Sequence, residues 1–168
     1  NSLAHYWGTK FFSREHSAVD NYLISLLTYG EGYHNYHHTF SHDYRNGIRW
    51  YHFDPAKWLI WVLHKCGFAY NLKRVSNDRI ERQLLLHHRD ELLEKMTSSF
   101  HAQKDLLAAK ITEICDHLNF LLKRKHELLE AYRKGQKDLI AEIRQVKKQI
   151  KDDWKAWRNA VKLVEATF

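Results

Sequence analysis

Three histidines, His34, His37 and His38, form an HxxHH pattern and are the residues of this sequence best suited to carry out chemistry. At relative positions 0, 3 and 4, their side chains fall on one face of a helical turn. Each imidazole has a polar nitrogen that needs a hydrogen-bond or metal partner. Burying a dense cluster of histidines in an apolar core without such partners therefore costs free energy. Neutral imidazoles are common metal ligands. The pattern therefore predicts one side of a metal site.

The elements around this pattern predict how it is positioned. Gly30 and Gly32 precede the histidines and allow the backbone to bend or approach another segment closely. Upstream, Asn1 and His5 lie one turn apart in a helix that we expect to end before Gly8, so both could face one metal centre.

Two polar residues lie next to the histidines in the sequence, Glu31 and Asn35. They could form a second shell that orients the ring N–H groups of metal-bound histidines. Helix capping or contact with solvent is the alternative interpretation for both.

The chain divides into two parts of different composition. Five of the six glycines, the only proline and four of the six tryptophans lie before residue 68. Ser76, Asn77 and Asp78 are all good N-cap residues, and the sequence after them is rich in Leu, Glu, Lys, Arg and Ala. We therefore expect short helices and loops over 1–77 and an amphipathic helical extension over 78–168.

Apolar residues recur in the second part with helical spacing. One series runs from Leu86 to Leu128 at intervals of seven, and another runs from Leu139 to Val164 at intervals of three and four. They predict a long helix, a bend near Gly135 and a second helix. Polar residues at many partner positions favour an antiparallel helical hairpin over a strict coiled coil, although the extension is coiled-coil-like. The predicted fold class is all-α.

Composition excludes several other classes of protein. The net charge of +7 is divided between the two parts, and neither part is a polycation, so no nucleic-acid partner is predicted. Cys66 and Cys115 form no CxxC pattern and predict no disulfide framework. No apolar run approaches the ~20 residues of a membrane span. Because the chain begins at Asn1 without an initiator Met or a signal-like segment, we expect it to be a piece of a longer protein.

Three segments resemble the C-terminal part of membrane fatty-acyl desaturases of the Δ9 acyl-CoA type. They are NSLAHYWG at 1–8, DNYLISLLTYGEGYHNYHHTF at 20–40 and DYRNGIRWYHFDPAKWLIW at 43–61. The resemblance covers about residues 1–80 and does not extend to 81–168.

The resemblance implies an integral membrane enzyme that holds two irons in a cage of histidines on the cytosolic side of the membrane. His34, His37 and His38 match the third histidine box of the family. His5 matches a further ligand, and Asn1 matches a residue that reaches one iron through water. No catalytic residue beyond these metal ligands is implied, and the substrate-binding residues stay unidentified.

The resemblance also implies a reaction. Such enzymes use reduced di-iron and O2 to insert a cis double bond, here of the Δ9 type, into the chain of an acyl-CoA or acyl-lipid. Electrons would come from a cytochrome b5-like or ferredoxin-like donor. A related membrane fatty-acid hydroxylase is the alternative enzyme. A different alternative makes 78–168 a module for self-association or docking.

The sequence departs from the family pattern at several points. Ser41 stands where many members have proline, and Val19 stands where many have arginine. The first HxxxxH box and the second HxxHH box are missing; His37 and His42 have HxxxxH spacing, which we attribute to chance. Because four histidines and one asparagine cannot complete the cage, we predict that this chain alone is inactive.

Overall fold

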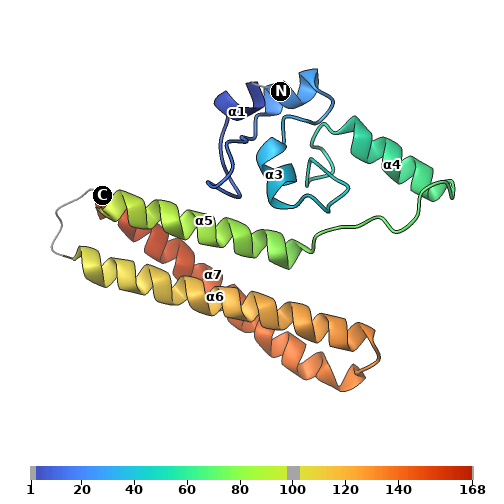
Figure 1. Ribbon diagram of the computed structural model, residues 1–168. Helices are drawn as coiled ribbons and strands as arrows, with labels where there is room; N and C mark the ends of the chain where they lie inside the picture. The colour runs from blue at the N-terminus through green and yellow to red at the C-terminus, as the bar shows by residue number, and fades with distance from the viewer. Residues whose placement is uncertain (1–2, 98–102, 168) are drawn as a thin grey trace. The chain divides into compact units, whose positions relative to one another are not determined.

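The computed structural model describes residues 3–97 and 103–167, and it divides into two compact units, Asn1–Ser76 and Asn77–Phe168. The described residues form α-helices, one short 3-10 helix and two isolated β-bridges but no strand (Figure 1), which confirms the predicted all-α class. No helix within these ranges is long and apolar enough to cross a membrane. The functional roles assigned to the two parts stay predictions.

The first unit consists of four short helices joined by turns and loops. They are α1 (Leu3–Tyr6), α2 (Tyr22–Leu27), α3 (His34–Thr39) and α4 (Pro55–Lys65). Helix α4 begins with Pro55 in its first turn, where the missing N–H does no harm. The carboxylate of Asp54 caps this helix by accepting the backbone N–H of Lys57 at 3.0 Å.

Helix α2 is capped by an asparagine side chain at its first turn. Asn21 is the N-cap residue, and its Oδ1 accepts the backbone N–H groups of Leu23 and Ile24 at 2.9 and 3.2 Å. Asn21 has the extended backbone that an N-cap requires. Because Asn21 caps α2, the carboxylate of Asp20 is available to accept hydrogen bonds from α3.

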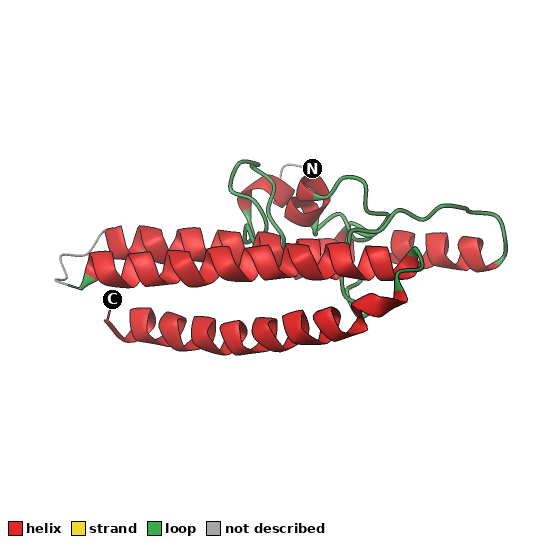
Figure 2. Cartoon of the chain, turned by 90° about the horizontal axis from the view of Figure 1, so that it is seen from below, coloured by secondary structure: helices red, strands yellow, loops and turns green. Residues whose placement is uncertain are grey.

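The second unit contains three long helices where the sequence predicted two. They are α5 (Asn77–Thr97), α6 (Lys104–Arg133) and α7 (Ile140–Thr167), with the 3-10 helix η1 (Lys137–Leu139) before α7. Helix α6 runs antiparallel to both neighbours (Figures 1 and 2). The first predicted helix is divided, because α5 ends at Thr97 and α6 begins at Lys104, on either side of residues that lie outside the described ranges. Phe100, part of the predicted series, lies outside the described residues.

The apolar side chains of these helices form one core. The series predicted in α7 is confirmed, and its buried members are Ile143, Val146, Ile150, Trp157, Val161 and Val164. In α5 and α6 the neighbouring positions Leu85, Leu92 and Leu118 are buried, whereas Leu106 is 72% exposed. A single heptad phase cannot continue through the break between α5 and α6. The apolar stripes are therefore packed within the unit, and self-association or docking through 78–168 stays a prediction.

Leu118 tests this core because its side chain is 0% exposed. We expect Leu118→Ala to lower the free energy of unfolding by about 2–5 kcal/mol, since it removes buried methyl groups and leaves a cavity. Urea unfolding followed by circular dichroism measures the change. Phe120→Ala is the control, because Phe120 lies two residues away and is 62% exposed. Similar losses in the two variants would contradict this packing.

Candidate metal centre

Helix α3 carries its histidines on one side and its anchoring residues on the other. Asn35 and Tyr36 are almost fully buried, at 0% and 1% exposure. With 100° between successive residues, the three histidines occupy an arc opposite this buried pair. The helix has only six residues, so contacts with the surrounding chain must hold it in place.

The first turn of α3 is capped by a residue distant in sequence. Tyr33 occupies the N-cap position and makes no side-chain cap hydrogen bond. Instead, Asp20 Oδ1 accepts the backbone N–H groups of Asn35 and Tyr36 at 2.8 and 3.3 Å. The backbone of Asp20 is itself fixed by two hydrogen bonds with Thr9, of 2.7 and 3.0 Å. Asp20 therefore satisfies N–H groups that the helix would otherwise leave unpaired.

The amide of Asn35 binds α3 to the preceding loop. Its Oδ1 accepts the backbone N–H groups of Phe12 and Ser13 at 2.8 and 3.2 Å. Its Nδ2 donates to the carbonyl oxygens of Ser13 and Ala18 at 2.7 and 3.0 Å. These four bonds use the full capacity of a side-chain amide. Asn35 therefore has no donor or acceptor left for a histidine ring in this arrangement, unlike the second-shell role that its position suggested.

Tyr36 anchors α3 to a buried polar network. Its hydroxyl donates to Asp43 Oδ2 at 2.7 Å, and the same carboxylate accepts Arg45 Nε and Nη2 at 2.9 and 2.7 Å. Burial would raise the pKa of Asp43, but the hydrogen bonds from Arg45, Tyr36 and the backbone of Val75 together hold it below its usual value. The carboxylate is thus charged and fully paired, as a buried charge needs to be.

Gly32 is required by the close approach of two backbone segments beside α3. A Cβ at this position would lie 2.2 Å from the backbone nitrogen of Ser25 and 2.4 Å from the carbonyl oxygen of Asn21. Both are backbone atoms, so neither could move aside easily. Gly32 thus lets α3 start directly against α2.

Two ring nitrogens of the histidine cluster face one another. His34 Nε2 and His38 Nε2 lie 3.1 Å apart. Two nitrogen ligands bound at right angles to one metal, with bonds of about 2.1 Å, are separated by about 3.0 Å. The ring of His5 lies beside this pair, with its centroid 4.9 Å from that of His34 and 6.4 Å from that of His38. His37 lies 6.3 Å from His34 and presents a further ring.

The other ring nitrogens are largely without partners. The Nδ1 atoms of His34 and His37 are buried and form no hydrogen bond. Glu31 Oε2 lies 3.9 Å from His34 Nδ1, which is too far for a hydrogen bond. His5 Nδ1 pairs with the hydroxyl of Ser17 at 2.8 Å, which leaves its Nε2 for another contact. Buried nitrogens without partners are expected where a ligand supplies the missing interaction.

The cluster favours the neutral form of imidazole, which is the form that binds metals. Burial lowers the pKa of His34, and the neighbouring His38 and His5 lower it further. Burial also lowers the pKa of His38, with a contribution from the ring of His16. His16 lies 5.5 Å from His38 between ring centroids and was not predicted, because it sits in a loop without ligand spacing.

The ligands present fit a metal held by imidazoles but do not make a complete site. Within residues 3–97 and 103–167, no group of three or more His, Cys, Asp or Glu side chains is arranged to hold a metal ion. Asn1, predicted to act through water, lies outside the described residues. The described residues therefore present two facing ring nitrogens, on His34 and His38, with the rings of His5 and His37 beside them.

Comparison with known proteins confirms the resemblance to fatty-acyl desaturases for part of the chain, although no family model matches it. Acyl-CoA desaturase 1 of Saccharomyces cerevisiae is 44% identical over 95 residues, which is 56% of this chain and 19% of that protein. The sn-2 palmitoyl-lipid 9-desaturase of Nostoc sp. is 39% identical over 69 residues, 41% of this chain and 24% of that protein. The acyl-CoA Delta(11) desaturase of Trichoplusia ni is 38% identical over 91 residues, 49% of this chain and 24% of that protein. The chain thus spans less than a quarter of the length of these relatives.

The anchoring of α3 predicts an unusual titration for Asp20. Burial raises the pKa of its carboxyl to about 6 from an ordinary 3.8, although the N–H groups of Tyr36 and Asn35 act in the opposite direction. Between these values the folded chain keeps a proton that the unfolded chain has released, so Asp20's contribution to stability falls as pH rises through this window. A carbon-13 NMR titration of the Asp carboxyl groups should show one midpoint near 6. A midpoint near 3.8 for Asp20 would contradict this burial.

Proposed function

We propose that this relative of the acyl-CoA and lipid desaturases is the C-terminal part of an integral-membrane, di-iron fatty-acyl desaturase. The observation that carries the proposal is the pair of facing Nε2 atoms on His34 and His38, 3.1 Å apart. The pair of nitrogens would suit several metals that bind imidazole, and the match of His34, His37 and His38 to the third histidine box of the desaturases favours iron among them. This segment would lie on the cytosolic face of the membrane.

Each predicted ligand has a distinct task under this proposal. His34 and His38 would bind one iron through Nε2, with His5 as their neighbour, and His37 would bind the second iron. Asn1 would reach an iron through water. When bound, the two irons supply the O2-dependent removal of two hydrogens from a saturated acyl chain. Neutral imidazoles suit this task because they leave the positive charge of the metals uncompensated.

The remaining residues of the site act on the ligands and not on the substrate. Asp20 holds the first turn of α3 through two backbone N–H groups, and Asn35 holds the loop that carries His16. Glu31 would accept a hydrogen bond from the Nδ1–H of a metal-bound His34 only after a small movement, since its carboxylate now lies 3.9 Å from that nitrogen. Such partners set the ring orientation and the tautomer of each ligand.

The whole protein would insert a cis double bond at Δ9 into an acyl-CoA or acyl-lipid. One relative is named as a 9-desaturase that acts on a palmitoyl-lipid, and another is named as an acyl-CoA Delta(11) desaturase. These two names differ in the acyl carrier and in the position of the double bond. The carrier and the position therefore have to be determined from the product of the whole protein. Electrons would come from a cytochrome b5-like or ferredoxin-like donor. The chain by itself would be inactive, because it holds only part of the ligand cage.

The test uses the whole protein with His38→Ala and, as a matched control, His42→Ala. His42 is exposed in the turn after α3 and lies outside the ring cluster. We expect His38→Ala to reduce bound iron and to abolish desaturation, and His42→Ala to preserve both. Iron per polypeptide is measured by mass spectrometry of the metal, and the product by gas chromatography.

Two results would contradict the proposal. Normal iron content and activity in His38→Ala would remove His38 from the ligand set. A hydroxylated chain without a new alkene in the unmodified protein would indicate a fatty-acid hydroxylase instead.

A further inference from the structure

Helix α4 presents its apolar side chains to the outside and buries a cation. Its sequence contains the uninterrupted apolar run Trp58–Leu63, yet the only buried residue of the helix is Lys57. Leu59 is 60% exposed, and Trp61 and Val62 are exposed as well. This is the reverse of a helix that packs against a protein core, where the apolar face is covered.

The buried lysine fixes this orientation. Lys57 Nζ donates to the carbonyl oxygens of Gly47, Arg49 and His52 at 2.9, 2.9 and 3.1 Å. All three protons of the ammonium group are therefore used. Rotating α4 to cover its apolar residues would break these bonds and leave a buried charge unpaired. The exposure of the apolar face is thus imposed by the fold of the unit.

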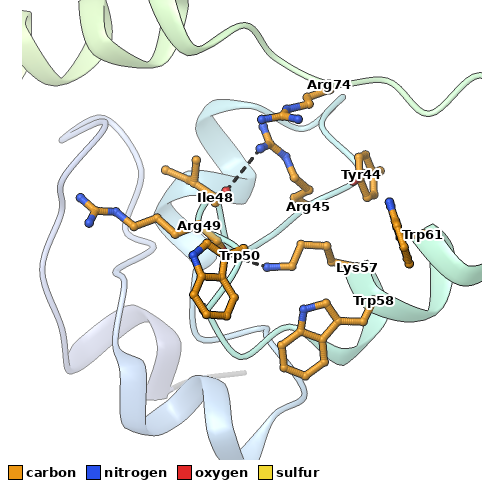
Figure 3. A pocket seen from close by; sticks show the side chains of 9 residues that line it. All are labelled: Tyr44, Arg45, Ile48, Arg49, Trp50, Lys57, Trp58, Trp61 and Arg74. Carbon is orange, nitrogen blue, oxygen red and sulfur yellow. Dashed lines mark hydrogen bonds between the residues drawn. The ribbon is translucent and has the colours of Figure 1, made fainter.

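A cationic pocket lies next to the exposed face. It has a volume of about 230 Å³, and Figure 3 shows its lining. The residues that line it are Tyr44, Arg45, Ile48, Arg49, Trp50, Lys57, Trp58, Trp61 and Arg74. None of these nine is acidic. The backbone around Arg74 is held by two hydrogen bonds, from Tyr44 N–H to the carbonyl of Lys73 at 3.0 Å and from Val75 N–H to Asp43 at 3.0 Å.

We propose that α4 and this pocket bind the surface of an anionic lipid bilayer, with the apolar face in the headgroup–acyl boundary and separate lipid phosphates beside Arg49 and Arg74. With 11 residues, α4 is too short to cross a bilayer, so it would lie along the surface. Exposed tryptophans beside cations are the composition of surface-bound helices. Trp50, 84% exposed at the edge of the pocket, extends the same face.

The charge of this region favours a lipid surface over other occupants. Residues 55–76 contain Lys57, Lys65, Lys73 and Arg74 and no acidic residue. A soluble phosphate compound would fill the pocket but leave the apolar side chains of α4 in water. Protein interfaces are depleted in lysine at their centres, whereas anionic membranes attract it. The inference does not depend on bound iron.

The test is flotation of the 168-residue chain with vesicles of phosphatidylcholine, with and without phosphatidylserine. We expect binding to the phosphatidylserine vesicles that weakens as salt increases. Trp58→Ser/Trp61→Ser should weaken it at least about tenfold, since two large apolar side chains are lost. Arg49→Gln/Arg74→Gln should weaken it about 25-fold, at about fivefold per cation.

Two double variants in the second unit control for general effects. Lys148→Gln/Lys151→Gln makes the same change in net charge, and Phe120→Ser/Leu163→Ser removes exposed apolar groups of similar kind. Both should bind vesicles as the unmodified chain does. Equal weakening in the controls would overturn the proposal.

Two further results would assign the surface to another occupant and overturn the proposal. One is binding of coenzyme A that depends on Arg49 and Arg74, with no binding to either kind of vesicle. The other is a dimer, seen by light scattering, that Trp58→Ser/Trp61→Ser dissociates while the unmodified chain ignores vesicles.

Discussion

The histidine cluster depends on a helix that is too short to be stable by itself. A six-residue helix forms one intrahelical turn and leaves most of its terminal groups unpaired. Asp20 supplies the acceptor that its first turn lacks, and Asn35 ties its buried side to the preceding loop. The position of every imidazole on α3 follows from these contacts. The buried polar network is therefore as important to the site as the ligands are.

The same principle orients the second surface of this unit. Lys57 is bound by three carbonyl oxygens and keeps α4 with its apolar residues outward, much as Asp20 keeps α3 with its histidines facing His5. In both helices the hydrogen bonds of a buried polar or charged group determine which face is exposed. If the burial of apolar side chains alone decided the orientation of α4, its apolar face would be covered and not exposed. The orientation of both helices is thus set by hydrogen-bonded polar groups more than by a large apolar core.

Local patterns predicted most of the helices and the composition of the histidine cluster. The HxxHH spacing, the Asp54–Pro55 start of α4 and the apolar series in α7 all act within a few residues, so sequence alone reveals them. The end of α5 at Thr97 was not predicted, because no glycine or proline marks it in the sequence. A heptad series that happened to continue through the break concealed it.

The contacts that position the site were not predictable from local patterns. Asp20 caps a helix that starts 14 residues later, and His16 approaches His38 from a loop. The sequence suggested Asn35 as a partner of the rings, but its amide is used by Phe12, Ser13 and Ala18. Lys57 is enclosed by three carbonyl groups, and no local sequence pattern marks that environment. Such long-range pairings depend on the path of the chain.

The central proposal is that Asp20 positions the histidines of the proposed iron site without contacting the metal. The most direct measurement is the iron content per polypeptide of the whole protein with Asp20→Asn and with Asp20→Ala. An asparagine keeps the oxygen that accepts the N–H groups of Asn35 and Tyr36, so we expect Asp20→Asn to retain its iron. Alanine removes that acceptor, so Asp20→Ala should lose most of its iron. Full iron content in Asp20→Ala would contradict the account.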